Sequence, residues 1–203
     1  MLRIAVLILI SALLVLPGFS QAGKRAEIKR IDPYAKTLDF FAKRNKRSNL
    51  VFADVSDYDQ GKAKWRRFVS ATALEKYRED DEVYGIANVW RRKSKVVLAV
   101  FTLSSPSGDW AKYVFMYFRP DGTIAKSESE LRTFYGDFIV RQDFYFDVQG
   151  KLIKKTKNYF DLSTRKPKKP DDDYLGVQKG FVDEENYYLT TKKLPFAHLL
   201  KLR

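Results

Sequence analysis

Cysteine is absent from this sequence of 203 residues, and histidine occurs once, as His198. Without cysteine the protein has no disulfide bond, no lipid-modified cysteine, no thiolate metal ligand and no thiol nucleophile. A single histidine also leaves the sequence without the ligand set of an ordinary zinc site. The fold must therefore be held together by its hydrophobic core alone.

Motifs of the common enzyme classes are also missing. The sequence has no phosphate-binding loop, no dinucleotide-binding fingerprint and no Gly-x-Ser-x-Gly turn. His198 lies among leucines, where a histidine is more often a packed side chain than a general base. A carboxylate pair is the remaining catalytic option, and its candidates are Glu128 with Glu130 and Glu184 with Glu185, which we expect at the solvated surface. We therefore predict a non-catalytic protein without metal or cofactor, and keep a carboxylate-based hydrolase as the third hypothesis for function.

The first 22 residues have the features of a secretory signal peptide. Arg3 precedes an apolar run over residues 4–16, and small residues at positions 20 and 22 follow a Pro-Gly break. This pattern predicts cleavage after Ala22. The alternative is an uncleaved membrane anchor, but the apolar run is shorter than the roughly 20 residues that a spanning helix needs. We predict an exported protein, periplasmic in a bacterium or secreted, that is not an integral membrane protein once residues 1–22 are removed.

Basic residues are in large excess. Lysine and arginine number 38 against 25 acidic residues, which gives a net charge of +13 at pH 7. Such an excess favours anionic partners, but it also promotes solubility, so net charge alone does not define a site. Hydrophobic residues make up 45% of the sequence and aromatic residues 15%, a composition typical of a globular protein. Residues 23–203 are long enough to form one domain with a substantial core.

The pattern of turns and apolar residues predicts an α+β domain. We expect one or two N-terminal helices, over residues 33–46 and 71–79, packed on a curved antiparallel meander of about six or seven strands. The first helix is predicted to begin at Asp32-Pro33, after a mobile basic segment over residues 23–30. Residues 49–55 are expected as a short strand or an extended connector. The strands of the meander are expected over residues 82–91, 95–104, 110–119, 123–133, 138–147 and 151–161.

Two turns of the expected meander have the same sequence layout. In residues 117–124 and 145–152, a Tyr-Phe pair is followed by a glycine four positions after the phenylalanine, at Gly122 and Gly150. This layout predicts a short hairpin loop with the glycine in the left-handed conformation. The cross-strand pairs predicted for the second hairpin are Asp147 with Lys151, Phe146 with Leu152, and Asp143 with Lys155.

A basic strip and an acidic segment follow each other near the end of the meander. Residues 151–170 carry eight basic residues against a single acid, and residues 171–185 carry six acids against Lys179. Prolines at positions 167 and 170 indicate an extended loop over residues 163–173. Either the two segments neutralise each other, or the basic strip is displayed to an anionic partner. The residues of the basic strip are Lys151, Lys154, Lys155, Lys157, Arg165, Lys166, Lys168 and Lys169.

These observations support two leading hypotheses for function. The first is an exported non-catalytic binding or structural protein of the cell envelope that engages an anionic lipid or glycan through the basic strip. No signature of a nucleic-acid-binding domain is present, so we expect no specific nucleic acid partner. The second is a carrier or sensor of an apolar small ligand held between helix and sheet. Residues 174–203 include an apolar tail, which we expect to dock on the core because large exposed apolar patches are rare on soluble proteins.

Overall fold

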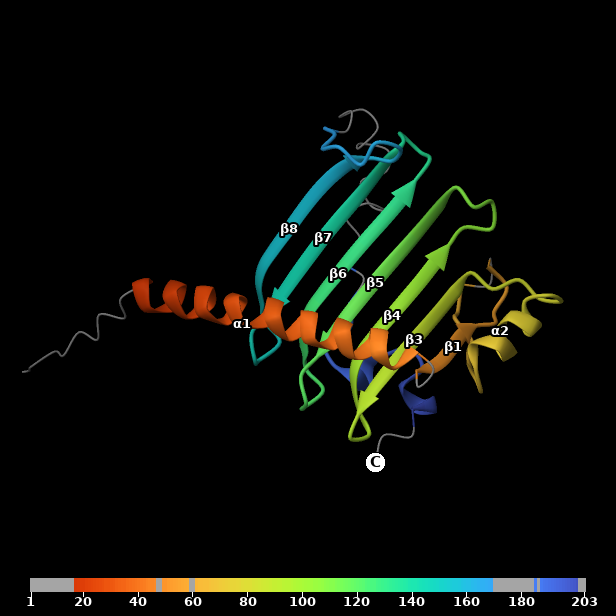
Figure 1. The fold of residues 1–203 in the computed structure, drawn as a ribbon, viewed down its shortest axis with the longest axis horizontal. Helices are drawn as coiled ribbons and strands as arrows, with labels where there is room; N and C mark the ends of the chain where they lie inside the picture. The colour runs from red at the N-terminus through yellow and green to blue at the C-terminus, as the bar shows by residue number, and fades with distance from the viewer. Residues whose placement is uncertain (1–16, 47–48, 59–60, 170–184, 186, 201–203) are drawn as a thin grey trace, which may run out of the picture.

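The computed structural model describes residues 17–46, 49–58, 61–169, 185 and 187–200. Within these residues, an antiparallel sheet of eight strands forms the centre of the fold, and helix α1 (Pro17–Arg44) lies across one of its faces (Figure 1). The strand order is β2-β1-β3-β4-β5-β6-β7-β8. The strands are β1 (Leu50–Asp54), β2 (Trp65–Phe68), β3 (Gly85–Arg92), β4 (Lys95–Ser104), β5 (Trp110–Phe118), β6 (Ile124–Thr133), β7 (Phe138–Phe146) and β8 (Leu152–Asp161).

This architecture confirms the predicted α+β class, in which a helix packs on an antiparallel meander. The strands expected over residues 82–161 correspond to β3 through β8. The sheet is larger than predicted because β1 and β2 extend it beyond β3, with β1 paired to both of its neighbours. Helix α2 (Ala71–Tyr77) follows β2 and begins after Ser70, whose hydroxyl oxygen accepts a hydrogen bond from the Ala73 N–H at 3.1 Å.

Helix α1 corrects the prediction for the N-terminal segment. The sequence predicts a helix that begins at Pro33 after a mobile segment, but α1 runs unbroken over residues 17–44. Proline inside a helix costs roughly 3 kcal/mol, and a longer apolar face offsets this cost, because Ile28 and Ile31 pack on the sheet ahead of the proline. The predicted cleavage position after Ala22 falls within α1, and the residues before α1 lie outside the described part.

The two glycine hairpins form as predicted, with one correction to the strand register. Gly122 and Gly150 adopt φ angles of +88° and +79°, and each glycine N–H donates to the carbonyl three residues earlier. A bulge at Ile153 of β8, opposite the end of β7, shifts the register of the second hairpin. The predicted pair of Asp143 with Lys155 is therefore wrong, because the bulge moves Asp143 one position along β8. The observed pairs are Asp143 with Thr156, Phe144 with Lys155, Phe146 with Leu152, and Asp147 with Lys151.

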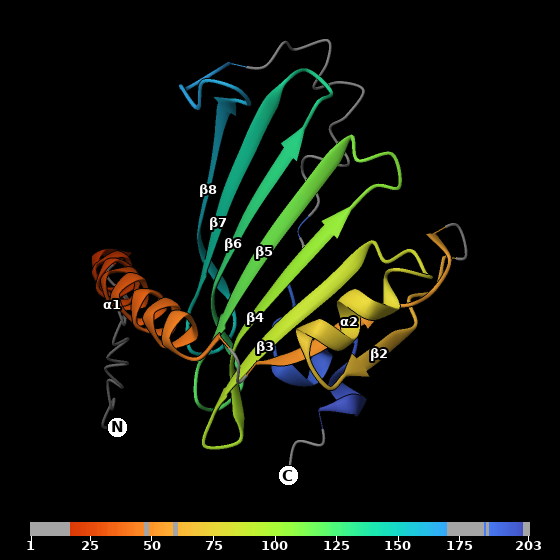
Figure 2. The same ribbon diagram turned by 45° about the vertical axis from the view of Figure 1, so that its right-hand side comes forward.

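The C-terminal segment packs on the face of the sheet opposite α1, as Figure 2 shows. The Phe196 ring stacks on Phe52 of β1 with ring centroids 4.3 Å apart, and Leu194 and Leu200 are buried in the same cluster. The Thr191 N–H donates to a carbonyl of the β5–β6 turn at 2.9 Å, which fastens the segment to that turn. The described residues of the expected docking tail therefore lie on the sheet.

Strands β4 and β5 are covered on both faces, which explains why their apolar residues do not alternate with polar ones. Leu98 and Tyr117 belong to the cluster beneath α1, whereas Phe101 and Met116 belong to the cluster beneath the C-terminal segment. A strand with protein on both sides has no solvent face to which polar side chains can be assigned. These two strands therefore form the middle layer between the two coverings of the sheet.

Candidate functional site

The structure divides the predicted basic strip into two parts. Lys154, Lys155 and Lys157 belong to β8, and because side chains alternate along a strand they do not share one face. Lys154 lies opposite Tyr145 on the side of α1, while the other two lie on the side of the C-terminal segment. Lys151 is exposed in the turn before β8. The eight basic residues thus do not form one continuous surface.

Neighbouring side chains engage the lysines of β8. The Lys154 ammonium lies 4.9 Å from the centroid of the Tyr145 ring, and the Lys155 ammonium lies 5.1 Å from that of Phe144. Lys155 also forms an ion pair with Glu185 at 3.0 Å, and this hydrogen bond lowers the pKa of Glu185. Glu185 of the acidic segment therefore neutralises part of the basic strip, and the rest of that segment lies outside the described part.

The remaining four basic residues lie at one end of the sheet. We call this region the tip, and it consists of Phe134–Asp137, the turn between β6 and β7, and Leu162–Lys169, the loop after β8. Lys168 joins the two parts, because its ammonium donates to the carbonyls of Gly136 and Asp137 at 2.8 and 3.0 Å. A backbone hydrogen bond between the two segments adds to this contact. Figure 1 shows the turn and the loop side by side, so two segments far apart in the sequence form one surface.

Asp161, the last residue of β8, fixes the conformation of the loop. Its carboxylate accepts hydrogen bonds from the backbone N–H groups of Thr164 and Ser163 at 2.8 and 3.1 Å, and from the Thr164 hydroxyl at 2.9 Å. These bonds from Thr164 and Ser163 lower the pKa of Asp161. Arg165 adopts a φ of +61°, and the Asp161 N–H donates to the Lys166 carbonyl at 2.8 Å. The loop is thus folded back on β8 in a defined conformation.

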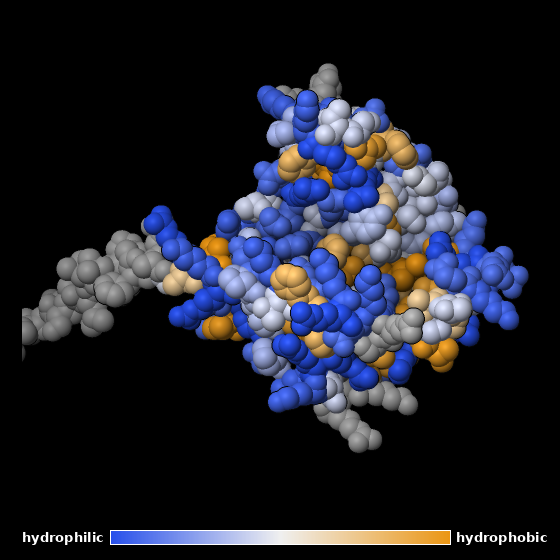
Figure 3. All heavy atoms as spheres, in the orientation of Figure 1, coloured by the Kyte–Doolittle hydropathy of each residue, from blue (hydrophilic) through white to orange (hydrophobic). Residues whose placement is uncertain are grey.

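The tip displays both apolar and basic side chains. Phe134 is 67% exposed and Tyr135 is 47% exposed. Figure 3 shows hydrophobic surface beside strongly hydrophilic surface at this end of the molecule. Besides Lys168, the tip has three exposed basic side chains that form no ion pair or side-chain hydrogen bond within the part that the structure describes. These are Arg165, Lys166 and Lys169.

A second charged cluster fastens α1 to the sheet. We call it the seam, and its members are Asp32 and Asp39 of α1 with Tyr117, Lys126, Glu128 and Tyr145 of the sheet. The Lys126 ammonium lies 2.7 Å from Asp32 Oδ1 and 2.7 Å from Glu128 Oε1. It also lies 4.8 Å from the centroid of the Tyr145 ring. The Tyr117 hydroxyl donates to Asp39 Oδ1 at 3.0 Å, which gives α1 a second polar attachment to the sheet.

Lys126 and Asp32 of the seam stabilise each other in their ionised forms. Burial lowers the pKa of Lys126, but the hydrogen bonds to Asp32 and Glu128 outweigh burial and raise that pKa. Burial raises the pKa of Asp32, but the hydrogen bond from Lys126 outweighs it and the pKa is lowered. A lysine held in its protonated form lacks the free electron pair of a nucleophile or a general base. The seam is therefore suited to holding α1 in place.

The carboxylate pairs considered for hydrolysis are also engaged by cations. Glu128 is held by Lys126, and Glu130 lies 2.7 Å from both Arg132 and Arg141. Burial raises the pKa of Glu130, but the hydrogen bonds from the two arginines outweigh burial and lower it. Of the second pair, Glu185 binds Lys155, and Glu184 lies outside the described residues. The lowered pKa values of Glu130 and Glu185 are the opposite of the raised pKa of a general acid.

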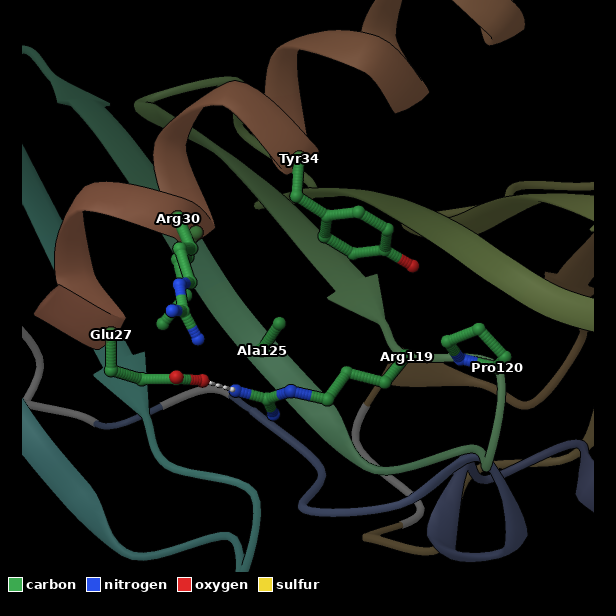
Figure 4. Close-up of a pocket in the computed structure, with 7 residues that line it drawn as sticks. Glu27, Arg30, Tyr34, Arg119, Pro120 and Ala125 are labelled. Atoms are coloured by element: carbon green, nitrogen blue, oxygen red, sulfur yellow. Dashed lines mark hydrogen bonds and ion pairs between the residues drawn. The ribbon is translucent and has the colours of Figure 1, made fainter.

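A cavity of about 310 Å³ lies between α1 and the hairpin of β5 and β6 (Figure 4). This is where the second hypothesis places an apolar ligand, but charged side chains form part of the lining. Arg119 donates hydrogen bonds to Glu27 at 3.1 Å and to the Phe146 carbonyl at 2.7 Å. The residues that line the cavity are Glu27, Arg30, Ile31, Tyr34, Arg119, Pro120 and Ala125.

Among the residues that the structure describes, no group of three or more histidine, aspartate or glutamate side chains is placed to hold a metal ion. His198, which the sequence suggests as a packed side chain, is exposed, because the short helical turn that carries it directs Leu200 into the core instead. No helix in the described part is long and apolar enough to cross a membrane.

Phe134 and Tyr135 were not among the residues predicted for a site. A signal was present, since two aromatic residues precede Gly-Asp in a turn between two strands, where polar residues are usual. What the sequence did not indicate is that the loop after β8 meets this turn through Lys168. The contacts of Arg119 were not predicted for the same reason. The partners of its guanidinium group, Glu27 and the Phe146 carbonyl, come from α1 and from β7.

Comparison with known protein families, with curated proteins and with solved structures finds no match for this chain. Function is therefore inferred from the tip, the seam and the cavity, and from what their geometry can do.

Proposed function

We propose that the protein is a non-catalytic binding module of the cell envelope that docks on an anionic lipid surface through the tip. The observation that carries this proposal is that Phe134 and Tyr135 are exposed in the same tip as basic side chains that have no ion-pair partner among the described residues. This combination supplies both kinds of attraction that peripheral membrane binding requires, an apolar one and an electrostatic one.

The two attractions have comparable sizes. Full burial of a phenylalanine side chain stabilises by roughly 1.5–3 kcal/mol, and aromatic side chains are enriched where a membrane meets water. Each lysine or arginine near an anionic lipid surface contributes about 1 kcal/mol. Three free bases and one inserted ring are therefore enough for reversible docking, and neither contribution alone makes stable attachment.

The tip is ordered before it meets a partner. Asp161 holds the loop backbone, and Lys168 holds the loop against the turn that carries the aromatic residues. Binding energy is reduced when side chains and loops must be ordered on association, and a preformed surface avoids part of that cost. The hydrogen bonds of these two residues thus support a docking role for the loop that they hold.

The outward side of α1 is the competing basic surface. Arg25, Lys29, Lys36 and Lys43 are exposed there, at spacings of four, seven and seven residues that place them in one row along the helix. Phe40 is exposed near this row. The tip is favoured because it has two adjacent aromatic residues and lies at the end of the strands, where it can touch a flat surface without contact from the rest of the sheet (Figure 1).

Vesicle co-sedimentation tests the proposal. The protein that begins at Gly23, the predicted mature form, is mixed with phosphatidylcholine vesicles that either contain or lack phosphatidylglycerol. The tip variant carries Arg165→Glu, Lys166→Glu and Lys169→Glu. Loss of three bases should weaken binding to the anionic vesicles about 100-fold or more, since each base contributes about 1 kcal/mol and reversal adds repulsion.

The matched control reverses three exposed bases of α1, through Arg25→Glu, Lys29→Glu and Lys36→Glu. It has the same net charge as the tip variant, so it should lose much less affinity if the tip is the docking surface. Equal losses of affinity in the two variants would show that vesicle binding depends on net charge and not on the tip, which would contradict the proposal. A larger loss in the α1 variant would assign docking to the helix and contradict the proposal.

A further inference from the structure

The cavity between α1 and the hairpin of β5 and β6 combines an apolar floor with charged walls. Ile31 and Ala125 are 3% and 1% exposed, and Tyr34 packs against the cluster to which both belong. The Tyr34 hydroxyl is turned away from this floor, because it donates to the Phe118 carbonyl. A ligand in the cavity would therefore meet hydrocarbon from three side chains on one side.

One of the two arginines in the cavity is already satisfied. The Arg119 side chain is 14% exposed, pairs with Glu27 at 3.1 Å and donates to two backbone carbonyls, those of Phe146 and Ile124. These contacts fix the guanidinium group in one place. Arg119 and Glu27 neutralise each other, so this pair adds no net charge to the cavity.

Arg30 is the second arginine, and its charge is not balanced. It lies one turn of α1 after Glu27, and Figure 4 shows its side chain directed from the helix toward the pair of Glu27 and Arg119. Among the described residues, the Arg30 side chain forms no ion pair and no hydrogen bond. The cavity therefore has one uncompensated positive charge at the edge of an apolar floor.

We propose that this cavity binds a small amphipathic monoanion, with a carboxylate on Arg30 and an apolar body against Ile31, Tyr34 and Ala125. The planar guanidinium group matches a carboxylate with two parallel hydrogen bonds. The volume of about 310 Å³ is at the small end of ligand pockets, so the body is a short chain or a single ring. The site is separate from the tip and does not depend on the function proposed for it.

Glu27 restricts the charge of the ligand. Its carboxylate lies in the cavity wall, where it would repel a second negative charge even though it is paired with Arg119. A monoanion can place its charge on Arg30 and keep its apolar end away from Glu27. A dianionic phosphate ester fits this arrangement less well, because only one positive charge in the cavity is free.

The experiment compares benzoate with benzamide, which has nearly the same shape and no charge. Binding to the purified protein is measured by titration calorimetry and by chemical-shift changes in NMR spectra. Benzoate should bind saturably at millimolar concentration, and benzamide should bind at least about tenfold more weakly, because it lacks the charge-assisted hydrogen bonds to Arg30.

Arg30→Gln should weaken benzoate binding at least about tenfold, because it removes the free guanidinium group. Arg25→Gln is the matched control, since Arg25 is exposed on the same helix and does not line the cavity. Both positions are exposed, so neither variant should change the melting temperature. Equal binding of benzoate and benzamide, equal affinities of the two variants, or no saturable benzoate binding would each overturn the proposal.

Discussion

The seam and the tip use basic residues in opposite ways. At the seam, the Lys126 side chain is only 9% exposed, lies between two carboxylates and also contacts the Tyr145 ring. At the tip, Arg165, Lys166 and Lys169 are exposed and have no ion-pair partner in the described part of the chain. The same types of residue thus fasten a helix in one place and remain available to a partner in the other.

The lysines of β8 lie between these two cases. Lys154 and Lys155 are exposed, yet each lies over an aromatic ring of the neighbouring strand, and Lys155 also binds Glu185. Lysine on an edge strand also discourages pairing with another chain, which gives these residues a structural role of their own. The basic residues of the seam, of β8 and of the tip therefore form three groups. Their side chains carry the same charge but differ in burial and in the partners that they contact.

The comparison predicts that substitutions at the seam change stability and leave vesicle binding unchanged. The largest effect is expected for Lys126→Ala, which leaves Asp32 and Glu128 without their cation. Breaking a fully buried ion pair costs about 3–5 kcal/mol. The two acids here are 44% and 36% exposed, so we expect a loss of about 2–3 kcal/mol in the free energy of unfolding.

Urea denaturation measures this loss, and Lys36→Ala is the control. Lys36 is exposed on α1 and forms no ion pair within the described residues, so its removal should change stability by less than about 0.5 kcal/mol. Binding of both variants to anionic vesicles should equal that of the unmodified protein. A Lys126→Ala protein that is fully stable but binds vesicles poorly would reverse the roles assigned to the seam and the tip.

A smaller loss of stability is expected when the pH is lowered and Asp32 of the seam becomes protonated. Burial raises the pKa of Asp32, but the hydrogen bond from Lys126 outweighs it, so the pKa is lower in the folded than in the unfolded protein. Such a carboxylate contributes stability above its unfolded pKa of about 3.9, and this stability is lost as the pH falls through the folded pKa.

For Asp32 the expected loss between about pH 5 and pH 2 is less than about 1 kcal/mol, because the side chain is 44% exposed. Comparison of urea unfolding curves at several pH values for the unmodified protein and for Asp32→Asn isolates this contribution. The variant should lose less stability in acid than the unmodified protein. An identical pH dependence would show that Asp32 is not stabilised by Lys126.

Much of the sheet could be predicted because its signals are local. Gly122 and Gly150 mark two hairpins, and apolar runs between turn residues mark β3 through β8. The bulge at Ile153 of β8 was not predicted, and it moved Asp143 from Lys155 to Thr156. The start of α1 was not predicted either, because Asp32-Pro33 has the pattern of a helix start, whereas contacts of Ile28 and Ile31 with the sheet decide the outcome.

The tip and the seam could be predicted only in part. The sequence indicates that residues 163–173 form a basic loop, but the contact of Lys168 with the β6–β7 turn depends on the order of the strands. The seam depends on how α1 crosses the sheet, since Asp32 and Lys126 are far apart in the sequence. The number of charged residues could be counted from the sequence, but the partner of each charged side chain could not be predicted from it.

The most direct test of docking through the tip uses the absence of cysteine, since a single introduced cysteine carries the only label. An environment-sensitive fluorophore is attached at Phe134→Cys in the tip and at Val69→Cys as the control. Val69 is 95% exposed and lies between β2 and α2, away from the tip. Both proteins begin at Gly23 and are mixed with phosphatidylcholine vesicles that contain or lack phosphatidylglycerol.

We predict that the label at position 134 shifts to shorter wavelength on vesicles with phosphatidylglycerol and stays unchanged on phosphatidylcholine alone, because the tip enters an anionic interface. The label at position 69 should report water in both cases. A vesicle-bound protein whose label at position 134 still reports water, or whose two labels shift equally, would contradict docking through the tip.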